Sequence, residues 1–272
     1  MLVNKVILNR AQFPLCLTLC QLFAAFAVTS PVVFLRGFTK IRLRDFFLYV
    51  LEAMLFALSL YANLQALMRT SVGTVIVGRS VVPLITFTAE LFTSRKISGD
   101  GRSTRRLISL LGVIFCCSLY AATDGKVHAS HNTAVFWLIF WVCLVAVQMI
   151  FGKWLISAVA LGRFERVFYT NSCALPFMLV LSAPEWTLIS ASGVAHDDNT
   201  IILVFLSCAV GIAISYCSWR LRELVSATTF GLVGVVNKMV TIYVSVFVLP
   251  ESFSLLGMMA IAGCVCSALF YS

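Results

Sequence analysis

The segment Ser226–Leu249 constrains the chain most, because it places one charge in the middle of an apolar run of membrane length. It reads SATTFGLVGVVNKMVTIYVSVFVL, and Lys238 is its only charged residue. About 20 apolar residues are enough to cross a bilayer as a helix, and a central Lys costs roughly 3 kcal/mol on insertion scales. Lys238 is either a packing lysine bonded to a neighbouring carbonyl or a cation lining a path for an anion, and we favour the second interpretation.

The rest of the chain repeats this apolar pattern. It is 61% hydrophobic and 11% charged, with a mean hydropathy of +0.99, which excludes a soluble globular domain. Short connections leave no room for a separate catalytic domain. We therefore predict an all-α polytopic membrane protein, in which residues 1–272 form a single transmembrane domain. About nine full spans are expected: Phe13–Leu35, Asp45–Leu67, Ser71–Phe92, Leu107–Thr123, Ala134–Leu155, Val167–Trp186, Ile201–Trp219, Ser226–Leu249 and Phe253–Tyr271.

The charges in the connections alternate along the chain. Each odd-numbered connection is basic, and each even-numbered one is neutral or acidic apart from a lone Arg69 in the second. By the positive-inside rule, the odd connections and the C-terminus face the cytosol. The net charge of +9 is accounted for by these connections and does not predict nucleic-acid binding. The basic residues of the odd connections are Arg36, Lys40, Arg42, Arg44, Arg95, Lys96, Arg102, Arg105, Arg106, Arg163, Arg166, Arg220 and Arg222.

No residue set predicts an enzyme or a metal site. The ten cysteines fall mostly inside apolar segments and form no paired CxxC framework, so we interpret them as small buried hydrophobes. The three histidines lie in connections without forming a cluster. No nucleophile with a base and no phosphate-cradling Gly loop is present. We expect neither catalysis nor a cofactor.

A second deep cation, Arg79, follows Gly78 near the middle of the span Ser71–Phe92. Aligning Gly78 with Gly234 offsets Arg79 and Lys238 by three residues, about one helical turn. The two spans are five apart, as expected for two inverted five-helix repeats with a site at the membrane midplane. The repeats would be residues 1–123 and 134–272. Arg79 and Lys238 predict an anionic ligand, unless Glu52 forms a salt bridge with Arg79.

Polar residues also occur at the start of the span Val167–Trp186. Phe168 and Tyr169 are typical of an interfacial aromatic belt, which composition alone favours. Asn171 is harder to explain as part of such a belt, because placing an amide against lipid costs free energy. Its side chain could instead hydrogen-bond the edge of a nucleotide base. Ser215, late in the seventh span, is either a further ligand or a hydroxyl bonded to its own helix.

These segments resemble the two motifs of GDP-sugar transporters, in the nucleotide-sugar branch of the drug/metabolite transporter superfamily. Gly234-Val235-Val236-Asn237-Lys238 is similar to the motif GALNK, and Phe168-Tyr169-Thr170-Asn171 is similar to FYNN. Arg79-Ser80 with Pro83-Leu84 looks like the family's fourth-helix signature, and Glu251, Gly257 and Leu269-Phe270-Tyr271 look like its last helix. The resemblance covers essentially the whole chain.

The resemblance implies a substrate site and a role for each position in it. Asn171 and Ser215 would lie near the base and Phe230 near the ribose, with Gly234, Asn237 and Lys238 near the diphosphate and sugar. Tyr169, Thr170 and Arg79 complete the substrate-binding set. Thr170 replaces the first asparagine, and Phe230 stands where the GDP-mannose group usually has tyrosine. These departures leave the base and sugar open.

The function implied is a Golgi antiporter without cofactors, which brings GDP-mannose or GDP-fucose into the lumen in exchange for GMP by alternating access. The endoplasmic reticulum or another endomembrane is left open as the compartment. The partners would be the nucleotide sugar, GMP and the lipid bilayer, with a homodimer left open and no nucleic acid. One alternative is a UDP-sugar or phosphorylated-metabolite antiporter of the same fold.

The family has about ten helices, and Met1–Leu8 resembles only the end of the first. We expect either an incomplete gene prediction, which we favour, or a nine-span form. The nine-span form would be a non-transporting membrane scaffold.

Overall fold

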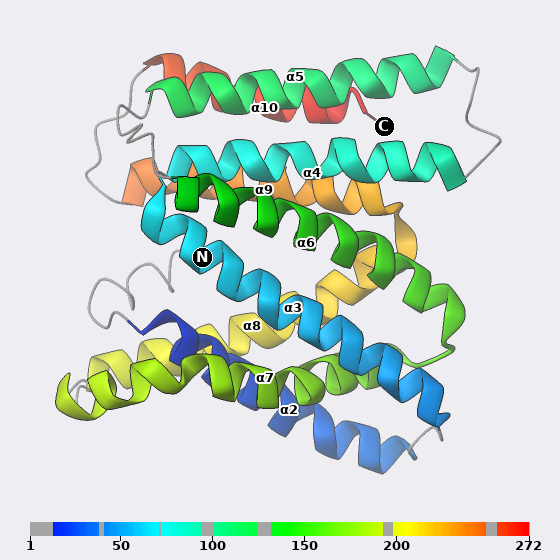
Figure 1. The fold of residues 1–272 in the computed structure, drawn as a ribbon, viewed down its shortest axis with the longest axis vertical. Helices are drawn as coiled ribbons and strands as arrows, with labels where there is room; N and C mark the ends of the chain where they lie inside the picture. The colour runs from blue at the N-terminus through cyan, green and yellow to red at the C-terminus, as the bar shows by residue number, and fades with distance from the viewer. Residues whose placement is uncertain are drawn as a thin grey trace. The chain divides into compact units, whose positions relative to one another are not determined.

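The computed structural model describes residues 13–37, 41–70, 72–93, 101–123, 132–192, 198–248 and 255–271 (Figure 1). Within these residues the chain forms α-helices and no strand. The expected stub Met1–Leu8 lies outside them. The helices are α2 (Pro14–Arg36), α3 (Leu43–Arg69), α4 (Val72–Thr93), α5 (Gly101–Thr123), α6 (Asn132–Ala158), α7 (Arg163–Ser192), α8 (Asp198–Leu224), α9 (Ala227–Val248) and α10 (Leu255–Leu269).

Each expected apolar span corresponds to one of these helices, so the protein is an all-helical polytopic membrane protein. Eight described helices are long and apolar enough to cross a membrane, while α10 is an apolar helix of only 15 residues. The prediction placed the starts of the fourth and sixth spans too late. Helices α5 and α7 begin at Gly101 and Arg163, before the apolar stretches do.

The helices form two compact units. Unit 1 comprises Met1–Tyr61 and Phe151–Leu224, and unit 2 comprises Ala62–Ile150 and Val225–Ser272. Helices α3 and α6 contribute residues to both units. Each unit therefore takes its helices from the early and the late part of the sequence.

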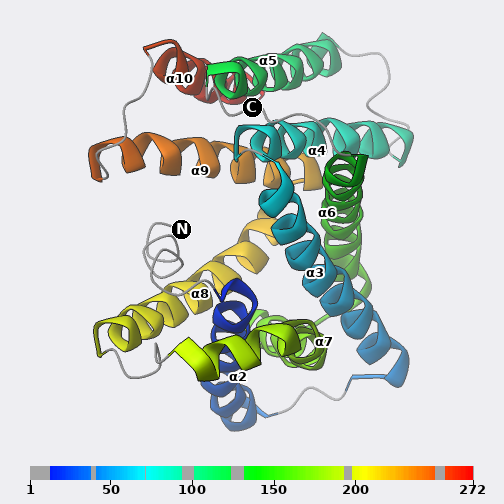
Figure 2. The ribbon, with the colours of Figure 1, turned by 60° about the vertical axis from the view of Figure 1, so that its left-hand side comes forward.

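In unit 1, α2 packs along α7 and α8 around a core rich in aromatic side chains (Figure 2). The centroid of the Tyr49 ring lies 5.7 Å from that of Tyr169 and 6.4 Å from that of Trp219. Phe26 stacks on Phe168 at 5.7 Å. All but Phe26 of these side chains are buried, and aromatic pairs in such geometries add stability beyond the burial of their area.

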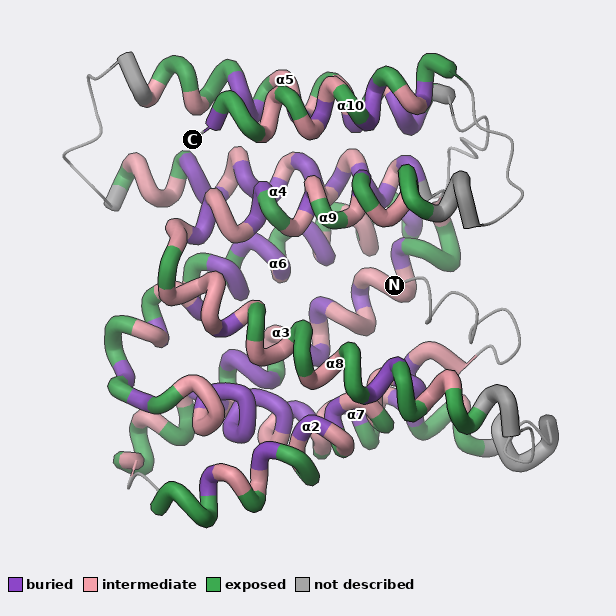
Figure 3. Tube along the Cα trace, turned by 180° about the vertical axis from the view of Figure 1, so that it is seen from behind, coloured by how far each residue is buried: buried purple, intermediate pink, exposed green. Residues whose placement is uncertain are grey.

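In unit 2, α4 packs against α5 and α9, and α10 packs against α5 and α9 (Figure 2). Buried residues from each of these four helices form one hydrophobic cluster, which includes Val113, Leu232, Met239 and Cys264. Purple segments along α4 and α9 in Figure 3 mark this buried surface. The unit is thus held together mainly by apolar packing between helices that are distant in sequence.

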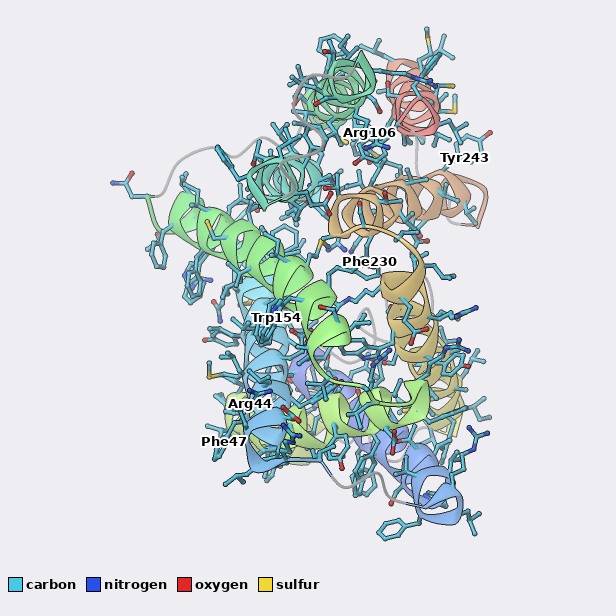
Figure 4. The ribbon with its side chains drawn as sticks, turned by 90° about the vertical axis from the view of Figure 1, so that its right-hand side faces the viewer. Arg44, Phe47, Arg106, Trp154, Phe230 and Tyr243 are labelled. Carbon is cyan, nitrogen blue, oxygen red and sulfur yellow. The ribbon has the colours of Figure 1, made fainter. Side chains whose placement is uncertain are left out.

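Contacts at the helix ends agree with the predicted alternation of the connections. Arg36, from the first connection, lies over the Phe164 ring of the fifth at 4.9 Å. Arg106, from the third, lies over the Tyr271 ring at the C-terminal end at 5.6 Å (Figure 4). Both contacts join ends that the charge pattern places on one side of the membrane.

Further contacts join helix ends that the charge pattern places on the other side of the membrane. Arg69, from the second connection, lies over the ring of Trp137, next to the fourth, at 5.8 Å. Glu185, assigned to the sixth, accepts hydrogen bonds from the backbone N–H groups of Leu15 and Cys16 at 3.2 and 2.9 Å. These amides belong to the first turn of α2, where N–H groups lack partners within the helix. Glu185 therefore caps the first full span.

Candidate functional site

Arg79 lies within α4, four residues before Pro83, in unit 2. Proline has no N–H, so Pro83 cannot give the Arg79 carbonyl its usual helical hydrogen bond. The Arg79 guanidinium crosses the backbone of α9 at Gly234. A Cβ added to Gly234 would lie 2.9 Å from Nη2 of Arg79 and 3.5 Å from its Nε. The glycine of the second motif thus makes room for the deep arginine.

A second glycine of α9 brings α4 still closer. Gly231 lies about one turn before Gly234, and a Cβ there would lie 3.3 Å from Cγ of Pro83 and 3.2 Å from Sδ of Met149. Small residues allow membrane helices to approach closely. The spacing of the two glycines therefore fixes where α4 meets α9.

Lys238 follows Gly234 by four residues, so both lie on one face of α9. Its side chain is half-buried and close enough to Arg79 for the two charges to interact. In the described parts of the chain, no carboxylate pairs with either cation and no carbonyl accepts from Lys238. Nε of Arg79 is also buried without a partner there. Lys238 thus makes none of the carbonyl hydrogen bonds expected of a packing lysine with the residues that the structure describes. Asn237 is exposed on α9.

The Gly234→Ala variant tests whether this placement of Arg79 matters. We expect an unchanged or slightly raised melting temperature, because Ala favours a helix by up to about 1 kcal/mol over Gly and a flexible arginine tip can move aside. Displacing the guanidinium should weaken anion binding about tenfold, measured by ligand titration of the purified protein. Gly211→Ala is the matched control, because its Cβ would meet only Gln21 at an ordinary 3.5 Å. Equal anion affinity in both variants would contradict the role given to Arg79.

The first motif lies in α7, within unit 1. Phe168 and Tyr169 are buried in the aromatic core described above, so the interpretation as an exposed interfacial belt is wrong. Nδ2 of Asn171 donates to the carbonyl of Val167 at 2.7 Å, which leaves its oxygen as the atom able to accept from a base. The Thr170 hydroxyl is buried and has no hydrogen-bond partner among the described residues.

Ser215 and Phe230 are two further residues of the expected site. Ser215, in α8, is half-buried and makes no hydrogen bond with any described residue. Phe230, near the start of α9 (Figure 4), packs against the apolar cluster of unit 2 that contains Met149. The structure thus brings Arg79, Gly234 and Lys238 together in unit 2. It places Tyr169, Thr170, Asn171 and Ser215 in unit 1.

Two carboxylates have partners that the sequence did not indicate. Glu52 pairs with Arg222, with 2.9 Å between Oε1 and Nη1, so it does not serve as the alternative salt-bridge partner of Arg79. Gly152 makes this pair possible, because a Cβ there would collide with Nη1 of Arg222. Glu90 accepts from both the backbone N–H and the hydroxyl of Thr228, at 3.1 and 2.8 Å, and caps α9.

Within the described residues, no group of three or more His, Cys, Asp or Glu side chains could hold a metal ion. The Arg79 guanidinium and the Lys238 ammonium offer the chemistry of anion binding. Arginine suits the paired oxygens of a phosphate, and lysine supplies a compact charge. Both properties fit a phosphorylated ligand.

Comparison with known proteins gives relatives that are named as GDP-sugar transporters. GDP-fucose transporter 1 of Arabidopsis thaliana is 26% identical over 284 residues, covering 99% of this chain and 80% of the relative. GDP-mannose transporter GONST3 of the same plant is 25% identical, covering 99% of this chain and 73% of the relative. This chain is similar to GDP-sugar transporters over nearly its whole length. The resemblance predicted from the two motifs is confirmed.

GDP-mannose transporter 1 of Saccharomyces cerevisiae is 26% identical over 200 residues, covering 68% of this chain and 58% of the relative. These GDP-sugar transporter relatives are named as transporters and not as enzymes. No family model matches the chain. A solved crystal structure shares the fold, with a TM-score of 0.67 and 12% identity over 94% of this chain and 88% of the other.

Proposed function

We propose that the protein is an antiporter that carries a GDP-sugar, GDP-mannose or GDP-fucose, into the Golgi lumen in exchange for GMP. The observation that carries this proposal is the approach of Arg79 to Gly234 beside Lys238, with no described carboxylate paired to either cation. GDP-sugars and GMP are both phosphate anions, so one cationic site can bind each in turn. The similarity to GDP-fucose and GDP-mannose transporters supports the choice of guanine nucleotides.

The base would be read by the first motif. Guanine presents two donors, N1–H and the 2-amino group, on its pairing edge, and these need acceptors. The Asn171 oxygen and the buried Thr170 hydroxyl can both accept. Tyr169 and Ser215 complete this base-binding set. Together with the two cations, Phe230, Gly234 and Asn237 would bind the ribose, the diphosphate and the sugar.

The proposed transport unit is the whole chain, residues 1–272, organised as repeats 1–123 and 134–272 that exchange access between the two membrane sides. We place the odd connections and the C-terminus in the cytosol. The alternation of basic connections supports this orientation. The contacts of Arg36 and Arg106 support only the placement of the joined ends on one side.

One observation favours a second candidate within the same transport class. Thr170 stands where the motif has an amide, and a hydroxyl can donate to or accept from either a purine or a pyrimidine. A UDP-sugar or a phosphorylated metabolite is the alternative substrate.

Thermal stabilisation by a ligand panel tests both candidates. The purified protein is heated with GMP, GDP-mannose, GDP-fucose, UMP or a UDP-sugar, since a ligand that binds only the folded state stabilises it by about 2.7 kcal/mol at roughly 100 times its Kd. We expect the melting temperature to rise with GMP and one GDP-sugar. A rise only with uridine compounds would establish the alternative. No rise with any compound would contradict a nucleotide-sugar substrate of either base and favour a membrane scaffold.

A further inference from the structure

Unit 1 contains a second cluster of cations, which includes none of the motif residues of α9. Arg163 begins α7, and Arg166 follows it by one turn, while Arg220 lies in the last turns of α8. All three guanidiniums contact one carboxylate, that of Glu223. Nε of Arg163 lies 2.9 Å and Nη1 of Arg220 lies 3.3 Å from Oε2, and Nη1 of Arg166 donates to Oε1. One negative charge thus faces three positive ones.

The charged groups around this cluster do not neutralise its excess of positive charge. Glu52 is paired with Arg222, and Glu165 accepts the backbone N–H of Gly162 at 2.7 Å. Lys153 adds a further cation, with Nζ donating to the carbonyls of Arg222 and Glu223 at 2.8 and 3.3 Å. The local excess of positive charge favours an additional anion.

One buried polar atom inside the cluster, Nε of Arg166, makes no hydrogen bond that meets ordinary geometry with a described residue, and the buried Tyr49 hydroxyl faces the same guanidinium. Both side chains are more than nine-tenths buried, and Tyr49 interacts electrostatically with Arg166. An unpaired buried donor costs free energy. A carboxylate has only two oxygens, whereas a phosphate group offers more acceptors to the same donors.

The outer side of the cluster is open. The side chains of Arg163 and Arg220 are 40% and 43% exposed, whereas that of Arg166 is 7% exposed. Lys153 binds the backbone carbonyls at the C-terminal end of α8, where a cation also complements the helix dipole. The backbone that carries Glu223 is therefore fixed, and its carboxylate can leave by side-chain rotation alone.

We propose that Arg163, Arg166 and Arg220 form a phosphate-binding position, which the Glu223 carboxylate occupies in the absence of a ligand. An incoming phosphate group displaces Glu223, accepts from the same three guanidiniums and reaches Nε of Arg166, which the carboxylate does not contact. The position is separate from Arg79 and Lys238 and does not rest on the identity of the transported nucleotide.

Pyrophosphate binding by the full-length protein in phosphatidylcholine nanodiscs tests the proposal. Glu223→Gln should raise pyrophosphate affinity about tenfold, which corresponds to about 1.4 kcal/mol, because a neutral amide competes weakly for the arginines. Adding Arg163→Gln and Arg220→Gln should remove the gain, and adding Lys238→Ala should leave it intact. Equal affinity in Glu223→Gln and the wild type, or loss of the gain with Lys238→Ala, would overturn the proposal.

Arginine labelling of the wild-type protein gives a second test that needs no variant. Phenylglyoxal modification is mapped by mass spectrometry with and without pyrophosphate. We expect protection of Arg163 and Arg220 and unchanged labelling of Arg44, an exposed arginine of the same unit (Figure 4).

Nanodiscs that contain phosphatidylinositol 4-phosphate distinguish the source of the phosphate. Protection by this lipid alone would identify a headgroup, and protection by pyrophosphate in phosphatidylcholine would identify a soluble compound. Undiminished labelling of Arg163 and Arg220 under all conditions would refute the site.

Discussion

Lys238→Ala is expected to reduce nucleotide-sugar exchange to background while the protein stays folded. Lys238 has no described ion pair or carbonyl partner to lose, and its removal takes a charge out of an apolar helix. In the ligand-bound state, however, removing one partner of a buried charge pair costs about 2–5 kcal/mol. That is a loss of roughly 30-fold or more in affinity.

The measurement is GMP-driven uptake of labelled GDP-mannose or GDP-fucose into proteoliposomes, alongside melting temperatures without ligand. Lys153→Ala is the matched control, because Lys153 binds the carbonyl groups that end α8. We expect it to lower the melting temperature and to retain exchange. Wild-type exchange by Lys238→Ala would refute the proposed mechanism.

Glu52→Ala should cause the largest loss of stability. The Glu52 side chain is 1% exposed and that of its partner Arg222 is 12% exposed. Removing Glu52 takes away the carboxylate that lies 2.9 Å from the Arg222 guanidinium in a buried position, and breaking such a pair typically costs about 3–5 kcal/mol. Scanning fluorimetry or heated size-exclusion chromatography would show a melting temperature lowered by many degrees.

The Glu52→Leu, Arg222→Leu double variant separates the effect of the buried charge from that of lost packing. Apolar replacement of a whole buried pair is often neutral or stabilising, so much of the lost melting temperature should return. Asp45→Ala is the control, because its partner Arg44 is 74% exposed and such surface pairs contribute little. A melting temperature for Glu52→Ala equal to that of Asp45→Ala would contradict the role of the pair.

Hydrophobic patterning alone was enough to locate the helices, since each apolar stretch became one. The alternation of basic and neutral or acidic connections could also be read from the sequence, because charged residues are excluded from the bilayer core and gather at the helix ends. Arg79 and Lys238 could be singled out for the same reason. That Gly234 would receive Arg79 could not be predicted, because it depends on how α4 crosses α9.

The ion pairs of unit 1 could not be predicted from the sequence, for a different reason. The charge pattern assigns Arg163 and Arg166 to a basic connection, because they stand next to an apolar stretch, and it gives Glu223 no role. In the structure they continue the helices and satisfy one another across 57 or more residues of sequence. Composition gives the number of charges at a membrane boundary, but only the packing of α7 against α8 decides which charges become partners.

The cap that Glu185 places on α2 has a consequence for biosynthesis. Leu15 and Glu185 are 170 residues apart, so the first full span leaves the ribosome roughly 10–35 s before its capping carboxylate at common elongation rates. During that interval the amides of its first turn must be hydrated or bound by lipid headgroups. Helix α2 can therefore dock on α7 with its cap in place only once the sixth span has been translated. A ribosome stalled before Glu185 would leave an inserted but undocked helix, a natural substrate for membrane quality control.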